Sequence, residues 1–197
     1  MKTSKAPTKE QMKASAYHFK FAEVKKLFIA APNFRDRCFV KTLFWLGLRR
    51  HEACALDISD IDFERRRVTV IGKGNKRRTI PVIDEEFLND LQHLIGESER
   101  GAVFLSNEGK RISLRTANDI TERIGKLAGI TNPNKRLAYV NPHIFRHSVA
   151  RFLKSKGFSA EWIQNFLGHE SYKTTMDMYG TISIDEMQEI ADMKLGE

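Results

Sequence analysis

The chain has 197 residues, of which 41% are hydrophobic and 29% are charged, and it contains 12 glycines and 5 prolines. This composition excludes collagen-like and wholly disordered chains, because it supplies enough apolar surface for a buried core. Lysine and arginine total 33 against 25 aspartate and glutamate, a formal net charge of +8. That surplus favours, without requiring, a polyanionic partner such as nucleic acid. The length predicts one domain with, at most, small appendages.

The apolar runs of the sequence are short. None approaches the roughly 18 residues of a membrane-spanning helix, and Met1 is followed by lysines and polar residues rather than by a signal peptide. An intracellular protein without a membrane partner is therefore expected. Cys38 and Cys54 are the two cysteines, and both lie in apolar-patterned segments. They are predicted to be reduced and buried, forming neither a disulfide nor a zinc site.

The N-terminal quarter begins with a basic stretch. Residues 1–17 contain four lysines and one glutamate with little apolar patterning, which predicts a flexible basic arm; a solvated tail without function is the alternative. Helical spacing of apolar residues begins at Val24, breaks at Pro32 and resumes at Phe39. Two packed helices are therefore expected before Gly47.

The middle of the chain mixes helix and strand patterns. A short helix is predicted from Arg50 to Leu56. Apolar residues then alternate on either side of a turn at residues 72–75, the pattern of a small antiparallel sheet. Further helices are expected near Glu85 to Leu94 and from Ser113 to Gly129, where apolar residues recur at helical spacing.

Two later helices have clear start signals. Asn141-Pro142 combines a capping residue with a proline suited to the first helical position, so a helix is predicted from there to about residue 156. Ser159 is predicted to cap another short helix, which ends at Gly168.

The chain shows no internal repeat and no boundary inside its main body. Residues 18–182 are predicted to form one α+β domain that is mostly α-helical, with a small antiparallel sheet. Residues 183–197 are predicted to form an acidic amphipathic helix. This helix either docks on a neighbouring protomer or packs on its own domain.

Candidate phosphate-binding residues open the helix at Asn141. His143 and Arg146 lie three residues apart, so their side chains share one face close to backbone amides that favour an anion. A capping histidine beside a surface arginine is the alternative. His143 and His147 lie four apart, as in zinc helices, but Ile144 replaces the glutamate of the metalloprotease motif. No metal site is predicted, and His147 is interpreted as a structural hydrogen-bonding group.

A second set of basic residues lies earlier in the chain. Arg49 precedes Glu52 by three residues, so the carboxylate can orient the guanidinium from behind, as in a phosphate clamp; a surface ion pair is the alternative. Lys73 lies in a glycine-flanked turn that permits close approach to a ligand, although a solvated turn lysine gives the same pattern. The turn continues into a basic hairpin that is predicted to contact a DNA backbone through Lys76, Arg77 and Arg78.

Five segments occur in a specific order: Gly47-Leu48-Arg49-Arg50-His51-Glu52, Gly72-Lys73-Gly74-Asn75-Lys76-Arg77-Arg78, His143-Ile144-Phe145-Arg146-His147, Leu167-Gly168-His169 and Tyr179. Each segment alone has a structural explanation. Together, over roughly residues 19–180, they resemble the catalytic domain of the tyrosine recombinase (phage integrase) family.

The resemblance implies the fold of that catalytic domain and a site-specific DNA recombinase that cleaves and rejoins DNA through a 3′-phosphotyrosyl intermediate. It implies no metal and no other cofactor. His143 is expected to assist proton transfer from the nucleophile. The implied catalytic residues are Arg49, Lys73, His143, Arg146, His169 and Tyr179, with Glu52 as the supporting acid.

The other roles follow from the same resemblance. Arg49, Arg146 and His169 are expected to bind the non-bridging phosphate oxygens, where charge accumulates in the transition state. Tyr179 is expected to attack phosphorus, and Lys73 to protonate the leaving 5′-oxygen.

The implied partner is double-stranded DNA. The protein is expected to be a monomer free in solution and a homotetramer on DNA, where accessory DNA-binding proteins join it. The implied location is the cytoplasm, on the nucleoid.

The sequence departs from the family pattern at three places. Arg50 occupies a position that is often small or apolar, and Tyr179 follows His169 by ten residues, where nine is commoner. Family members also carry a separate helical domain in front of the catalytic domain, where this chain has only residues 1–17. The chain is therefore either an excised catalytic domain or a short recombinase similar to the fimbrial phase-switch invertases.

Two rival functions share parts of this pattern. A type IB topoisomerase uses the same kinds of residues to relax supercoils as a monomer, and a non-catalytic DNA-binding regulator could retain the domain. The small size and the Leu167-Gly168-His169 segment favour a recombinase, and the intact set of six polar residues argues against a regulator.

Overall fold

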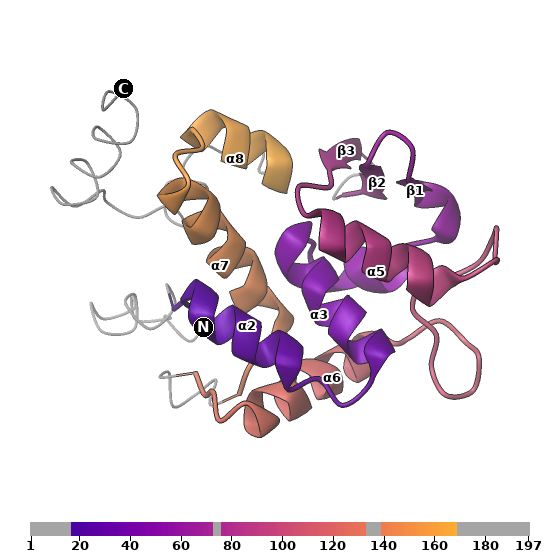
Figure 1. Ribbon diagram of the computed structural model, residues 1–197, viewed down its shortest axis with the longest axis horizontal. Helices are drawn as coiled ribbons and strands as arrows, with labels where there is room; N and C mark the ends of the chain where they lie inside the picture. Colours follow the sequence, from indigo (N-terminus) through magenta and orange to yellow (C-terminus); the bar gives the residue numbers. More distant parts are fainter. Residues whose placement is uncertain (1–16, 73–75, 133–138, 169–197) are drawn as a thin grey trace, which may run out of the picture.

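The computed structural model describes residues 17–72, 76–132 and 139–168. Most of these residues are helical, and a small antiparallel sheet lies at one end of the domain (Figure 1). The predicted fold class is confirmed. The elements are α2 (Phe21–Ile29), α3 (Phe34–Trp45), α4 (Arg50–Ala55), the 3₁₀ turn η1 (Ile58–Asp60), β1 (Ile61–Asp62), β2 (Arg67–Ile71), β3 (Arg77–Pro81), α5 (Glu85–Ile95), α6 (Leu114–Leu127), α7 (Pro142–Ser155) and α8 (Ala160–Leu167).

Helix α3 is the centre of the fold. It packs against α2, α4, α5 and α7, and every residue from Cys38 to Trp45 is buried. A helix covered on all sides has no wide polar face, which explains why the sequence shows only a weak amphipathic pattern there. Cys38 and Cys54 are buried free thiols, as predicted.

The sheet has the order β1-β2-β3, and both pairs of strands are antiparallel. Val68 faces Ile80 across β2 and β3, and both side chains are buried, so the predicted alternation is confirmed. The two-residue strand β1 was not predicted, because a segment of that length has too few residues to show a period.

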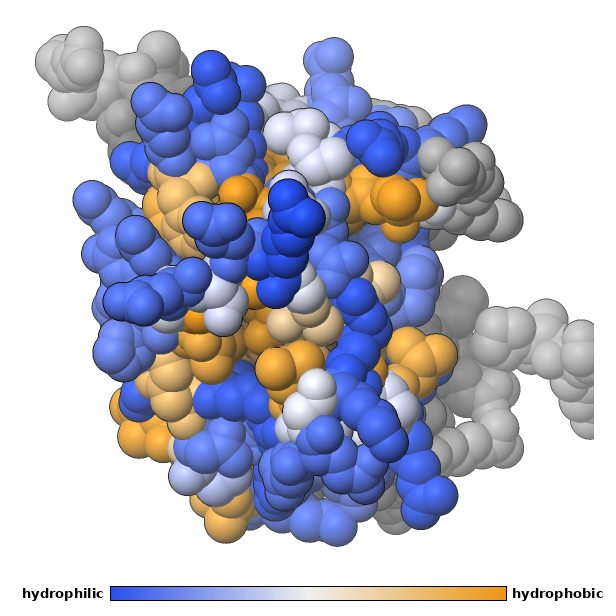
Figure 2. Space-filling model, turned by 90° about the vertical axis from the view of Figure 1, so that its right-hand side faces the viewer, coloured by the Kyte–Doolittle hydropathy of each residue, from blue (hydrophilic) through white to orange (hydrophobic). Residues whose placement is uncertain are grey.

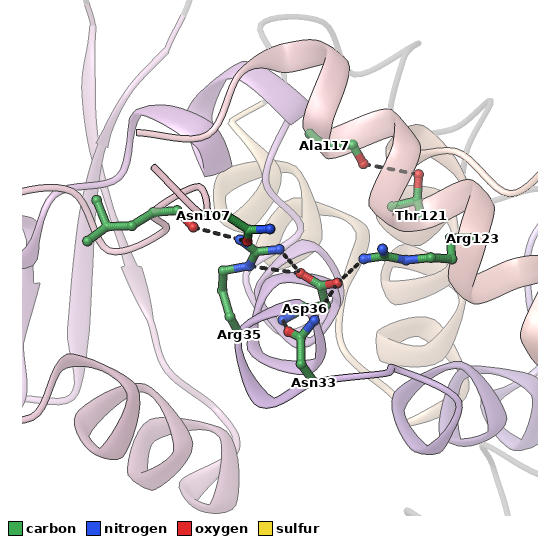
Figure 3. A network of polar contacts seen from close by, with 8 residues as sticks. Asn33, Arg35, Asp36, Asn107, Ala117, Thr121 and Arg123 are labelled. Atoms are coloured by element: carbon green, nitrogen blue, oxygen red, sulfur yellow. Dashed lines mark hydrogen bonds and ion pairs between the residues drawn. The ribbon is translucent and has the colours of Figure 1, made fainter. Parts of the chain in front are cut away.

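A buried carboxylate ties the start of α3 to distant parts of the chain (Figure 3). Asp36 is fully buried and accepts hydrogen bonds from Arg35 and, 87 residues away on α6, from Arg123. The Arg35 guanidinium also donates to the carbonyl of Leu105 at 2.8 Å. The amide of Asp36 donates to the capping Asn33 side chain at 2.9 Å. We call Asn33, Arg35, Asp36 and Arg123 the Asp36 network.

Helices α7 and α8 begin where the sequence predicts. The Asn141 side chain accepts a hydrogen bond from the His143 amide, and Ser159 accepts one from Trp162. Gly168 ends α8 in the left-handed conformation, with φ +65°. Along α8, Trp162 stacks on Phe166 with ring centroids 5.1 Å apart.

The surface on the side of the sheet and α5 is mainly hydrophilic, and its apolar residues form separate patches (Figure 2). Among the helices in the described ranges, none has both the length and the apolar character needed to cross a bilayer. Of the predicted N-terminal arm only Tyr17 belongs to the described residues, and the predicted C-terminal helix at 183–197 lies outside them.

Candidate active site

Five of the residues predicted for the site come together where α4, β3, α7 and the end of α8 meet. They are Arg49, Glu52, Arg78, His143 and Arg146. Lys76 and Arg77 are exposed at the start of β3. Lys73, His169 and Tyr179 lie outside the described residues.

The contact predicted between Arg49 and Glu52 is present. Arg49 is the extended residue before α4, and its backbone amide donates to Glu52 Oε2 at 2.7 Å. Its guanidinium Nη1 donates to Glu52 Oε1 at 3.0 Å. One carboxylate therefore fixes both the backbone and the side chain of Arg49, while a third of that side chain remains exposed.

Arg78 takes a place that the sequence did not predict. Its two terminal nitrogens donate to Glu52 Oε1 and Oε2 at 2.8 and 2.9 Å, so it lies inside the site rather than on the outer face of the basic hairpin. Its stem packs against Gly168, where an added Cβ would lie 2.5 Å from Arg78 Cδ. This bidentate pair joins residues 26 positions apart, beyond the reach of local spacing rules.

Arg146 is almost completely buried, with 2% of its surface exposed. Its guanidinium donates to the carbonyls of Gly47 and Leu167, each at 2.5 Å. The Gly47 carbonyl is presented by a left-handed backbone with φ +57°, a conformation that glycine adopts readily. Arg49 also reaches the end of α8, through the Gly168 carbonyl at 3.4 Å.

Charge in this cluster is unbalanced toward positive. Burial alone would raise the pKa of Glu52, but the hydrogen bonds and charge of Arg78, together with the Arg49 amide, hold it at about 2. Burial lowers the pKa of Arg146 to about 9, and the charge of Arg49 contributes, so Arg146 stays protonated at neutral pH. Three arginines against one carboxylate leave a surplus of two positive charges, which suits an anionic ligand.

Two histidines face each other on the first turns of α7. The Nε2 atoms of His143 and His147 lie 2.9 Å apart, so one ring donates and the other accepts. Desolvation lowers the pKa of His143, and the charges of Arg146 and Arg49 lower it further. Burial and then the neighbouring His143 lower the pKa of His147 to about 4. Both pKa shifts favour the neutral rings, and His147 has the hydrogen-bonding role predicted for it.

The sequence matches the phage integrase family over residues 18–183. The chain belongs to this family. It is 35% identical over 178 residues to tyrosine recombinase XerA of Pyrococcus furiosus, covering 86% of this chain and 59% of that protein. It is 33% identical over 146 residues to tyrosine recombinase XerC of Corynebacterium glutamicum, covering 72% and 45%. The chain thus spans about half the length of these curated relatives.

Solved structures agree with this membership. A crystal structure of XerA recombinase superposes with a TM-score of 0.75 at 29% identity, covering 90% of this chain and 65% of that one. A structure of XerH site-specific recombinase bound to its difH substrate gives a TM-score of 0.71 at 22% identity, covering 90% and 54%. The second likeness shows a shared fold.

We call Arg49 and Arg146 the clamp; in this phage integrase domain Arg49 borders an open groove. The groove has a volume of about 670 Å³ and is lined by Arg49, His143 and His147 together with Tyr17, Asn118 and Tyr139. The last three were not predicted, because they come from separate segments and carry no local motif. Within the described ranges, no three histidine, cysteine or acidic side chains gather in a way that could hold a metal ion.

Proposed function

We propose that the chain is the catalytic domain of a site-specific tyrosine recombinase that cleaves and rejoins double-stranded DNA. The observation that carries the proposal is the clamp of Arg49 and Arg146, which has surplus positive charge and whose Arg49 side chain lines a groove together with His143. The names of the relatives, tyrosine recombinases XerC and XerA, support it. The XerH complex with its difH substrate supports DNA as the ligand.

The clamp suits a phosphodiester that is being attacked. Negative charge grows on the two non-bridging oxygens as a nucleophile approaches, so donors that are already in place stabilise the transition state most. Arg49 and Arg146 are held from behind by Glu52 and by backbone carbonyls. Their positions are therefore fixed before DNA binds, and His169 is proposed as a further donor to the same oxygens.

The covalent step conserves the phosphodiester energy. The Tyr179 oxygen bonds to phosphorus as the bond to the 5′-oxygen breaks, which leaves a 3′-phosphotyrosine and a free 5′-hydroxyl. Tyrosine has an ordinary pKa near 10 and is protonated at neutral pH. Neutral His143 accepts that proton, and Lys73 donates one to the leaving oxygen. Rejoining reverses these transfers.

The assembly proposed for this reaction is a homotetramer on DNA formed from free monomers, with accessory DNA-binding proteins. Strand exchange joins two duplexes and therefore needs four active sites. Lys76 and Arg77, both exposed, are proposed to contact the DNA backbone. The segment 183–197 is proposed to dock on a neighbouring protomer. The proposed location of the reaction is the cytoplasm, on the nucleoid.

The test is a denaturing gel of the protein with nicked suicide duplexes taken from the gene's own flanks. Wild type is expected to form a covalent adduct. Tyr179→Phe is expected to form none while retaining DNA binding, because it lacks only the nucleophilic oxygen. Equal cleavage by both proteins would contradict the assignment of Tyr179.

The same preparations separate the rival functions. Plasmid relaxation without recombinant product would indicate a topoisomerase. Retardation of DNA by the wild type without any adduct would indicate a regulator.

A further inference from the structure

We propose that Arg78 is a positioning residue, which neutralises Glu52 so that the positive charge of Arg49 and Arg146 remains available to the DNA phosphate. This inference rests on the proposed function and adds a residue to its machinery. It also replaces, for Arg78, the predicted role of a DNA-backbone contact.

The geometry of the ion pair is the first argument. The Glu52 side chain is fully buried, and each of its oxygens accepts one hydrogen bond from the Arg78 guanidinium, at 2.8 and 2.9 Å. Among the described residues, the other hydrogen bonds to Glu52 come from the amide and Nη1 of Arg49. A bidentate arginine–carboxylate pair is the strongest form of this contact, so the charge of Glu52 is compensated chiefly by Arg78.

The second argument is the charge that remains. A buried carboxylate with only one arginine beside it would cancel the charge of that arginine. With Arg78 bound to Glu52, Arg49 keeps the contact with Glu52 that orients its side chain, and the cluster as a whole stays positive. A buried carboxylate left without compensation would also oppose the approach of a phosphate.

The third argument is the position of Arg78 on its strand. Along β3, Arg77 is exposed and Arg78 points inward, as strand alternation requires. The inward side chain packs against Gly168, whose carbonyl accepts a hydrogen bond from Arg49. Arg78 therefore contacts both groups that hold Arg49. Arg77 has the same residue type on the opposite face, and it provides the matched comparison.

The experiment measures the single-turnover cleavage rate at saturating protein, the DNA dissociation constant and its salt dependence. Arg78→Met is expected to slow cleavage on the order of 100-fold while changing affinity little. Arg77→Met is expected to act on affinity, lowering the slope of log K against log salt by about one. A loss of affinity and salt slope in Arg78→Met, with an unchanged saturating rate, would show a phosphate contact and overturn the proposal.

Rescue by a second substitution separates charge compensation from mere packing. Once Glu52 is neutral, Arg78 has no charge to compensate, so Glu52→Gln and Glu52→Gln/Arg78→Met are expected to cleave at similar rates. This comparison holds even if Arg78→Met alone does not fold. The proposal would be overturned if Arg78→Met slowed cleavage by the same factor in the Glu52→Gln background as in the wild type. Absence of a Tyr179-dependent adduct from wild type would instead overturn the proposed function, and this inference with it.

Discussion

Two buried carboxylates in this domain are arranged alike and serve different ends. Asp36 and Glu52 each occupy the third position of a helix, α3 and α4, and each lies between two arginines. Both side chains are fully buried. A buried acid between arginines is therefore not by itself the mark of a functional site.

The difference lies in what surrounds the two acids. In the Asp36 network the arginine that is more distant in the sequence, Arg123, is 52% exposed, so water screens its charge. Beside Glu52 a third guanidinium, Arg146, is 2% exposed and is held by backbone carbonyls. Positive charge that is buried without a matching acid, next to a groove, distinguishes the candidate site from a structural network.

The largest effect is expected from matched arginine-to-lysine substitutions in the two regions. Arg146→Lys keeps the charge but loses the planar fork, and is expected to slow cleavage on the order of a hundred- to a thousandfold. Arg123→Lys is expected to leave the rate within about twofold, because lysine keeps the positive charge beside Asp36 and Arg123 does not line the groove. Single-turnover cleavage with thermal melting as the folding control measures both. Similar losses in the two variants would remove the distinction between the regions.

The second prediction concerns acid stability. The folded pKa of Glu52, about 2, lies below its ordinary value of 4.5. The resulting stabilisation is fully present above about pH 4.5 and is lost as pH falls through about 2; it amounts to roughly 3 kcal/mol. Denaturant unfolding between pH 6 and 2 should show this loss in wild type and less of it in Glu52→Gln. Parallel curves for the two proteins would contradict the buried ion pair.

The third prediction uses two glycines with positive φ. Gly47, at φ +57°, is closely packed, since an added Cβ would lie 2.6 Å from Leu167 Cδ2 and would displace that side chain; Gly109, at φ +72°, has nothing within 4 Å. Gly109→Ala is expected to cost about 1 kcal/mol of unfolding free energy from backbone strain alone. Gly47→Ala is expected to cost more and to slow cleavage, because the Gly47 carbonyl holds Arg146. Equal melting temperatures would argue against the close packing at Gly47.

Small effects, on stability alone, are expected at the helix caps of the two regions. Asn141→Ala removes one capping hydrogen bond from α7 and is expected to cost about 1 kcal/mol. Asn33→Ala removes a cap and, in addition, the bond from its side-chain nitrogen to Asp36 Oδ2 at 3.1 Å, so its cost is expected to be larger. Chemical denaturation measures both. A larger loss of unfolding free energy for Asn141→Ala than for Asn33→Ala would show that the Asn141 side chain does more than cap α7.

The sequence predicted what depends on neighbouring residues. Helix starts at Asn141 and Ser159, and the contact of Arg49 with Glu52 three positions on, follow from local rules. The pairing of Arg78 with Glu52 and of Arg123 with Asp36 spans 26 and 87 positions. Such contacts depend on how β3 and α6 pack, which no local pattern encodes. The assignment of the nucleophile, Tyr179, remains a prediction.

The aromatic stack on α8 offers an optical probe of the site. The protein has two tryptophans. One of them, Trp162, stacks on Phe166, the residue before Leu167, whose carbonyl holds Arg146. A variant with Trp45 replaced by phenylalanine would leave Trp162 as the single fluorophore. Its emission would then report, in real time and without a label, whether the end of α8 shifts when a duplex enters the groove.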